Sequence, residues 1–271
     1  MKSIARILLA AYDYTVFYLG LLEFVVLCLV WSALAGVLYL VLPRETGCRI
    51  GRIGIMLGFR IFLASLTLSG RFKFDLRALD GLRKKGATII APNHPSLWDA
   101  VMMASRLPNV ACIMKSVIVN NILLGGGARL ARYIRNDSIR SMISLAVQDL
   151  QNGNHVLLFP EGTRTVTPPI GTLKGSIGLI ACRARAPVQT VLIETDTPFL
   201  SKGWPAYRKP PLPLSYRVRL GRHFDAPSSS ASLVPELQHY FTESLTGAQS
   251  ARNMAADQAL PLDGPQTANA K

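Results

Sequence analysis

The chain has 271 residues, a mean hydropathy of +0.27 and a formal net charge of +14 at pH 7. This length accommodates one α/β domain with accessory segments, and the hydropathy is high for a soluble enzyme but low for a polytopic transporter. The excess of positive charge indicates an anionic partner. Because the sequence carries neither zinc-finger spacing nor an RNA-binding aromatic signature, we expect an anionic lipid surface and no nucleic acid.

The cysteines lack the paired spacing of a disulfide framework or a zinc site; they are Cys28, Cys48, Cys112 and Cys182. We expect them to be buried as small apolar residues in a reducing compartment. The sequence also shows no cluster of metal-ligand residues, so no metal site and no Lewis-acid chemistry are expected.

A long apolar segment lies near the N-terminus. Residues 14–42 are almost wholly apolar, and residues 24–42 carry no charge. Such a run is long enough to cross a hydrocarbon core of about 30 Å. A secretory signal peptide is the alternative, but the apolar part is too long for a typical signal core and no convincing cleavage site follows. The segment predicts a membrane anchor, either transmembrane or re-entrant.

Arginines follow this segment in excess over its N-terminal flank, at Arg44, Arg49, Arg52 and Arg60. The positive-inside tendency therefore places residues 43 onward on the cytoplasmic face of the membrane. On a helix the last three arginines fall within about 80° of one another. This stripe predicts an interfacial helix over residues 50–68 or the second arm of a re-entrant hairpin. The alternative is an ordinary amphipathic helix packed on the domain.

The rest of the chain alternates strands and helices. Short β-branched runs predict strands at residues 71–75, 87–91, 109–115, 155–159, 187–193 and 215–220. Helices are predicted at residues 78–85, 100–105, 138–152, 174–185 and 228–245. Alternation of this kind indicates a mainly parallel sheet covered by helices, hence an α/β fold. We divide the chain into a membrane anchor (1–68), an α/β domain (69–225), and a short helix with a disordered tail (226–271).

Two connections stand out. Gly125, Gly126 and Gly127 lack the spacing of a dinucleotide fingerprint and are not followed by a P-loop lysine, so residues 120–127 are predicted to be a loop. Residues 195–213 are rich in proline and aromatic residues. We interpret them as a surface excursion that reaches the lipid interface.

The stretch Pro92-Asn93-His94-Pro95-Ser96-Leu97-Trp98-Asp99 joins a predicted buried strand to a predicted helix. His94 thus follows the carboxyl end of a strand, where open α/β sheets place ligands. One interpretation is structural: Ser96 is the N-cap of the helix and Asp99 completes a capping box. The other is chemical: the Asp99 carboxylate leans back toward His94 and fixes its tautomer, leaving the second ring nitrogen as a base. This stretch alone supports both.

A second motif, Phe159-Pro160-Glu161-Gly162-Thr163-Arg164, follows another predicted strand. Together the two motifs resemble those of the lysophospholipid acyltransferase superfamily of glycerolipid acyltransferases, over residues 70–195. The resemblance implies that His94 is the general base and Asp99 its orienting partner. It also implies that Glu161, Gly162, Thr163 and Arg164 bind the acceptor. The donor is then acyl-CoA or acyl-carrier protein, with no resident cofactor.

The acceptor is less well specified than the chemistry. Lys115 and Arg135 are further candidate acceptor ligands, since both carry positive charge near strand ends. The family's second motif ends in an acidic residue followed by arginine, but here Arg135 comes one place early and Asn136 takes its position. In the fourth motif Thr190 replaces a proline. A neutral amide suits a hydroxyl better than a phosphate, so the sequence leans slightly toward an acceptor other than lysophosphatidate.

The sequence therefore predicts a membrane-bound O-acyltransferase that moves a fatty acyl group from a thioester to a lipid hydroxyl. No G-x-S-x-G elbow is present, which argues against a serine hydrolase. The alternatives are an acyltransferase acting on a non-glycerophospholipid acceptor (a specialised lipid or pigment), a catalytically silent lipid-binding homologue, and a thioesterase.

Overall fold

The computed structural model describes residues 2–258, and within them seven strands form one sheet in the order β1-β7-β6-β2-β5-β3-β4. The strands are β1 (Phe72–Asp75), β2 (Ile89–Pro92), β3 (Val110–Met114), β4 (Ile134–Arg135), β5 (His155–Leu157), β6 (Val188–Thr195) and β7 (Leu214–Phe224). Strands β2 to β6 run parallel, while β7 is antiparallel to β6. The predicted α/β fold with a mainly parallel sheet is confirmed. The carboxyl ends of β2 to β6 share one edge of the sheet.

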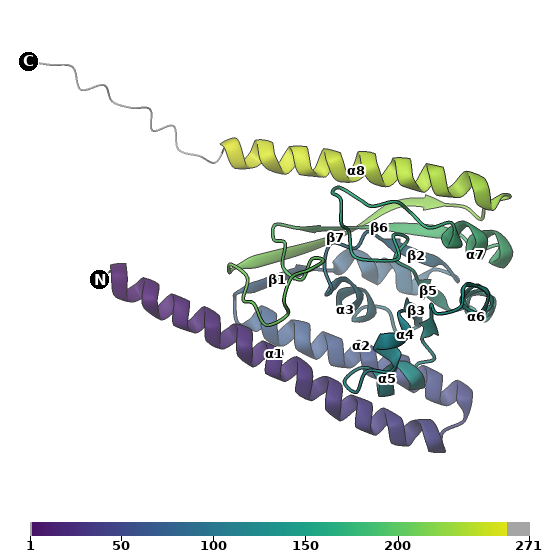
Figure 1. Cartoon of the computed structure of the whole chain (residues 1–271), viewed down its shortest axis with the longest axis horizontal. Coiled ribbons are helices and arrows are strands. Elements are labelled where there is room, and N and C mark those ends of the chain that lie inside the picture. The colour runs from purple at the N-terminus through teal and green to yellow at the C-terminus, as the bar shows by residue number, and fades with distance from the viewer. Residues whose placement is uncertain (1, 259–271) are drawn as a thin grey trace, which may run out of the picture.

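The helices cover both faces of this sheet. They are α1 (Lys2–Val41), α2 (Arg44–Leu68), η1 (Arg77–Lys84), α3 (Asp99–Ala104), α4 (Ser116–Val119), α5 (Gly125–Leu130), α6 (Ile139–Gln151), α7 (Ser176–Ala184) and α8 (Ser230–Gln258). The α1–α2 hairpin lies on one side of the sheet and α8 on the other (Figure 1). Successive side chains of β2 point to opposite faces of the sheet. Ile90 packs in the core between the sheet and the hairpin, and Ile89 packs in the core between the sheet and helices α6 to α8.

The N-terminal hairpin consists of two antiparallel helices. Gly20 of α1 faces Leu66 of α2, and Trp31 faces Gly54. Both helices are long and apolar enough to cross a membrane by length and composition. The α/β domain nevertheless contacts α1 at two places along its length. Arg71 forms an ion pair with Asp13, and α5 packs on α1 nearer its C-terminal end.

The predicted arginine stripe on α2 is wrong for Arg52. Its side chain is only 3% exposed and forms an ion pair of 2.8 Å with Asp149 of α6. Its Nε also donates to the carbonyl oxygen of Ala131. Arg49 and Arg60 remain exposed. At Arg52 the alternative interpretation holds, because this face of α2 packs on the domain.

The predicted glycine loop is also wrong, since Gly125–Leu130 forms helix α5. Its glycines are buried, and a Cβ atom on Gly126 would overlap the backbone of Ser32 in α1. A Cβ on Gly127 would lie 2.7 Å from the indole nitrogen of Trp31. The glycines therefore permit close helix packing, which outweighs their low helix propensity.

The C-terminal helix is longer than predicted. It runs without a break from Ser230 to Gln258, past residue 245, where the predicted helix ends, and into the predicted disordered tail. Residues 259–271, the remainder of that predicted tail, lie outside the described residues.

Candidate active site

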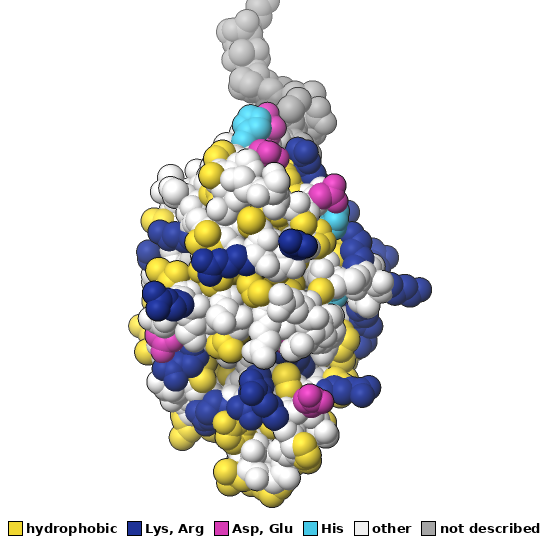
Figure 2. All heavy atoms as spheres, turned by 90° about the vertical axis from the view of Figure 1, so that its right-hand side faces the viewer, with side chains coloured by type: hydrophobic (Ala, Val, Ile, Leu, Met, Phe, Trp, Pro, Cys, Tyr) yellow, Lys and Arg dark blue, Asp and Glu magenta, His cyan; other side chains and the backbone are white. Residues whose placement is uncertain are grey.

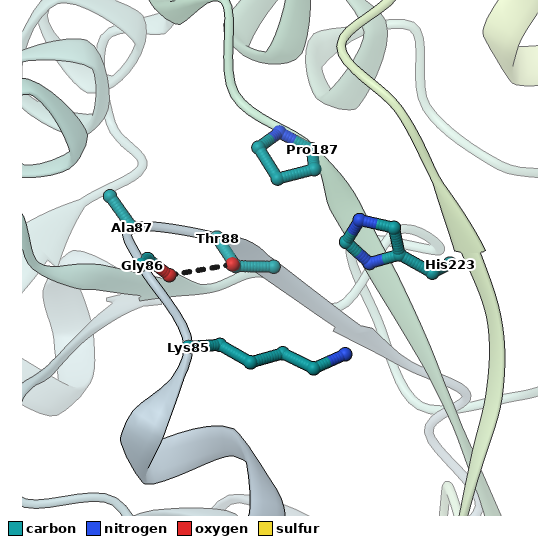
Figure 3. Close-up of a pocket in the computed structure, with 6 residues that line it drawn as sticks. All are labelled: Lys85, Gly86, Ala87, Thr88, Pro187 and His223. Atoms are coloured by element: carbon teal, nitrogen blue, oxygen red, sulfur yellow. Dashed lines mark hydrogen bonds between the residues drawn. The ribbon is translucent and has the colours of Figure 1, made fainter.

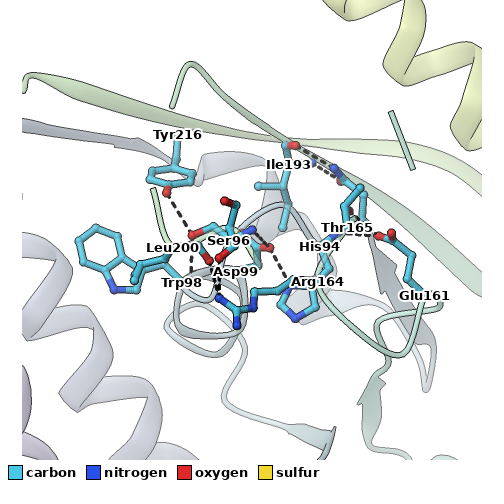
Figure 4. A network of polar contacts seen from close by, with 12 residues as sticks. His94, Ser96, Trp98, Asp99, Glu161, Arg164, Thr165, Ile193, Leu200 and Tyr216 are labelled. Atoms are coloured by element: carbon cyan, nitrogen blue, oxygen red, sulfur yellow. Dashed lines mark hydrogen bonds and ion pairs between the residues drawn. The ribbon is translucent and has the colours of Figure 1, made fainter. Parts of the chain in front are cut away.

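The first site loop leaves β2 at a fixed position. The buried amide of Asn93 bonds twice to the backbone of Ile193 in β6, accepting from its N–H at 2.7 Å and donating to its carbonyl at 3.0 Å. These bonds continue the pairing of β2 with β6 by one residue. His94 therefore starts from a rigid point at the carboxyl edge of the sheet (Figure 4). The sequence alone indicated no role for Asn93.

His94 and Asp99 form a close pair. Nδ1 of His94 lies 2.8 Å from Oδ2 of Asp99, and the same oxygen accepts the backbone N–H of Ser96 at 2.8 Å. The Asp99 carboxylate thus leans back toward both His94 and Ser96, as the two interpretations predicted. The helix itself begins at Asp99, with Trp98 and not Ser96 at the N-cap position.

The environment of this pair suits an acid–base function. Asp99 is fully buried, while the His94 side chain is 14% exposed. Burial raises the pKa of Asp99, and the hydrogen bond from His94 opposes this shift. With Nδ1 donating to the carboxylate, Nε2 carries the lone pair and can accept a proton.

Phe159 holds the imidazole from one side. The two rings stack with their centroids 3.9 Å apart and 22° between the planes. The second motif thus contacts His94 through its first residue, a role that the sequence did not indicate.

Glu161 occupies a place that differs from the predicted one. Its side chain is buried, and its carboxylate accepts from the N–H of His94 at 3.1 Å, the hydroxyl of Thr165 at 2.8 Å and the N–H of Gly171 at 2.8 Å. Thr165 N–H donates in turn to the carbonyl of His94 at 2.8 Å. Glu161 therefore joins the two motif loops instead of facing an acceptor. The expectation that it is an acceptor ligand is corrected.

The rest of this motif is closer to solvent. Gly162 is exposed in a left-handed conformation with φ +69°, and Thr163 is half-buried. Nη1 of Arg164 donates to the carbonyl oxygens of Leu200 and Ser201, both at 2.8 Å. Both bonds use Nη1, so neither involves Nε or Nη2. Arg164 thus holds residues 196–213, the connection between β6 and β7, against the site.

Lys115 follows β3 and Arg135 is the last residue of β4, at the same edge of the sheet. Lys115 is exposed, and Arg135 is half-exposed with an ion pair of 2.6 Å to Asp137. Because β5 and β3 separate β4 from β2 and strands lie about 4.8 Å apart, Arg135 is about 14 Å from the His94 strand. The structure therefore brings Glu161 and Arg164 to His94, but leaves Arg135 at a distance.

Two hollows flank the sheet. A shallow pocket lies at the amino end of β2, away from His94, and is lined by Lys85, Gly86, Ala87, Thr88, Pro187 and His223 (Figure 3). A second, apolar cavity of about 40 Å³ lies between the hairpin and the domain. Its lining is Phe17, Gly20, Leu21, Phe24, Phe62, Leu66, Phe72 and Trp98. Only this second cavity adjoins the His94–Asp99 loop, through Trp98.

The comparison with known families agrees with this geometry. Residues 73–194, which contain both motif loops, match the model of the Acyltransferase family. The segment that carries the site is thus an Acyltransferase-family domain. This acyltransferase is 23% identical to the 1-acyl-sn-glycerol-3-phosphate acyltransferase of Pseudomonas aeruginosa over 187 residues, 66% of this chain and 69% of the relative.

A solved structure has a similar fold. The crystal structure of the 1-acyl-sn-glycerophosphate acyltransferase from Thermotoga maritima matches with a TM-score of 0.61 and 18% identity. The match covers 92% of this acyltransferase and 98% of the other chain. The segment 196–213 and strand β7, which border the site, lie outside the residues matched by the family model.

Proposed function

We propose that this acyltransferase moves a long acyl chain from an acyl thioester, acyl-CoA or acyl-carrier protein, to the free hydroxyl of a lysophospholipid at a membrane surface. The observation that carries the proposal is the 2.8 Å contact between His94 and buried Asp99, which leaves Nε2 of the ring as a base. The family match supports the reaction class.

The reaction proceeds by direct transfer. Nε2 of His94 takes the proton of the acceptor hydroxyl as its oxygen attacks the thioester carbonyl. The carbon–oxygen bond forms, the tetrahedral intermediate collapses, and the carbon–sulfur bond breaks. The thiolate receives the proton from the imidazolium, which Asp99 stabilises in the meantime.

The first acceptor to test is 1-acylglycerol 3-phosphate. Both named relatives carry this acceptor in their names, which supports the choice. Arg164, with guanidinium nitrogens to spare, and exposed Lys115 supply positive charge for a phosphate.

A second candidate is an acceptor without a phosphomonoester. Arg135 is already paired with Asp137, and Asn136 stands where the family has arginine. These two observations favour a neutral or zwitterionic head group. A panel of lysophospholipids with purified protein separates the candidates: the proposal requires acyl transfer to at least one of them, above thioester hydrolysis alone. Transfer to none would overturn it.

The acyl chain is placed in the apolar cavity beside Trp98. Since ligand pockets generally measure roughly 300–1,000 Å³, this cavity of about 40 Å³ must widen by separation of α1 from the domain. Leu21→Trp, which adds bulk to the lining without the 2.7 Å overlap with Leu66 that any side chain at Gly20 would create, should therefore shorten the preferred acyl chain.

We propose that the hairpin lies in the membrane surface instead of crossing it. Exposed apolar side chains line α1 at helical spacing: Leu19, Leu22, Val26, Val30, Leu34 and Val37. The domain flanks α1 from Asp13 to Ser32, about 28 Å of helix, so a spanning α1 would draw the domain into the hydrocarbon core.

Surface charge supports an anionic lipid partner. Lys and Arg side chains are spread over the face in Figure 2, and apolar ones gather at its lower end, where α1 and α2 meet. We propose the anionic cytoplasmic leaflet as the surface that the domain meets. Vesicle sedimentation tests this: binding should fall when phosphatidylglycerol is omitted, and equal binding to neutral vesicles would contradict it.

A further inference from the structure

A tyrosine from outside the family-matched segment lies directly behind the catalytic loop. Tyr216 belongs to β7 and is 1% exposed. Its hydroxyl donates to Oγ of Ser96 at 3.1 Å, as the left part of Figure 4 shows. Its ring packs on Phe74 and Trp98, with centroids 5.8 and 6.3 Å apart.

The contact continues to Asp99. Oγ of Ser96 also accepts the N–H of Trp98 at 3.3 Å, which closes the turn before α3. The N–H of the same serine donates to Oδ2 of Asp99 at 2.8 Å. The position of Ser96 therefore sets the direction of one of the two bonds that hold the carboxylate.

Asp99 depends on those two bonds. Its other oxygen, Oδ1, is buried and has no hydrogen-bond partner among the described residues. A carboxylate fixed through one oxygen alone can rotate when either bond loosens. One of the two bonds comes from the His94 ring, which Asp99 itself must orient. The N–H of Ser96 is therefore the one backbone group among the described residues that fixes the carboxylate independently of that ring.

We propose that Tyr216 is a positioning residue for acyl transfer, acting through Ser96 to fix the Asp99 carboxylate against His94. It touches no reacting atom and is not a catalytic residue. Burial raises the pKa of its hydroxyl, so the group remains a donor at neutral pH. The inference rests on the proposed function, because its readout is the rate of acyl transfer.

The test is a double-mutant cycle. Tyr216→Phe keeps the ring and removes the hydroxyl's bond to Ser96, together with its longer contact of 3.4 Å to the carbonyl oxygen of Phe199. The kcat should therefore fall roughly 3- to 10-fold with little change in either KM. In the Asp99→Asn background, where the positioned group is already altered, the same change should lower kcat less than about 2-fold. In a second cycle, the losses of kcat caused by Tyr216→Phe and Ser96→Ala should also be non-additive. This cycle decides the question if the Asp99→Asn enzyme is too slow to measure.

A matched control separates positioning from stability. Tyr240 also bonds β7, its hydroxyl accepting the N–H of Arg222 at 2.9 Å, but far along the strand from Ser96. Tyr240→Phe should leave kcat within about 2-fold of wild type at a comparable loss of stability. Additive losses in both cycles, or equal losses of kcat for the two tyrosine variants, would overturn the inference. Failure of the wild type to transfer acyl groups would instead contradict the proposed function.

Discussion

The carboxylate of Glu161 accepts a hydrogen bond from the backbone N–H of His94, although the two residues lie 67 positions apart in the sequence. Glu161 is buried and also receives bonds from Thr165 and Gly171. The loop of residues 159–164 therefore stabilises the loop of residues 92–99 through a buried side chain. His94 is held at its backbone by Glu161, at its ring nitrogen by Asp99 and at its ring face by Phe159.

Replacing Glu161 should damage both the fold and the chemistry. Glu161→Ala leaves buried donors without a partner, so the free energy of unfolding should fall by about 2–5 kcal/mol and kcat should fall with it. Urea denaturation and steady-state kinetics measure the two effects. Glu243→Ala, at an exposed ion pair, is the control and should change neither. A raised KM for the acceptor with unchanged stability would instead favour a substrate ligand.

Arg164 should keep residues 196–213 in a fixed conformation. Arg164→Gln removes the charged donor to Leu200 and Ser201, so trypsin should cleave at exposed Lys202 and Arg208 several times faster. Mass spectrometry of the fragments gives the sites. Arg135→Gln, which removes a local surface ion pair, should leave the cleavage rate unchanged. Equal rates for both variants would contradict the fastening role.

The glycines of α5 should be sensitive to size. Gly126→Ala places a methyl group against the backbone of Ser32 and should cost about 1–3 kcal/mol of stability. Gly58→Ala in α2, where a Cβ meets nothing within 4 Å, should instead be neutral or stabilising by about 0.5–1 kcal/mol. Thermal unfolding in detergent compares them. A stable Gly126→Ala protein would mean that α5 does not pack on α1 as described.

Buried His155 should make stability depend on pH. Burial lowers its pKa in the folded state below the unfolded value of about 6.5, so protons bind the unfolded chain more tightly. Its contribution is constant above about pH 6.5, and stability is lost as the pH falls toward the folded pKa. His155→Gln should flatten the decline of Tm between neutral and acidic pH. The exposed control His239→Gln should retain the wild-type slope.

Local patterns predicted most of the elements and the central pair. Strands and helices follow from apolar periodicity, and His94 and Asp99 meet because one short turn holds both. Contacts between distant residues could not be found this way. Arg52 pairs with Asp149 across 97 positions, and Tyr216 reaches Ser96 across 120. Nothing in the sequence around either residue indicates its partner.

The wrong predictions share a physical cause. The glycines of residues 125–127 have low helix propensity, but tight packing on α1 favours a helix there. Arg52 matched an interfacial stripe by angle, but an acidic partner on α6 made burial of its charge possible. In both cases a tertiary contact outweighed a correct local preference.

The central claim is that His94 is the base for acyl transfer. The direct measurement is product formation, by mass spectrometry, from a long-chain acyl-CoA and a panel of lysophospholipids that includes 1-acylglycerol 3-phosphate. Wild-type protein should form an acylated product. His94→Ala should form none above background while remaining folded, with some loss of Tm because buried Asp99 loses one of its two hydrogen-bond partners. A folded His94→Ala protein with near wild-type turnover would contradict the account.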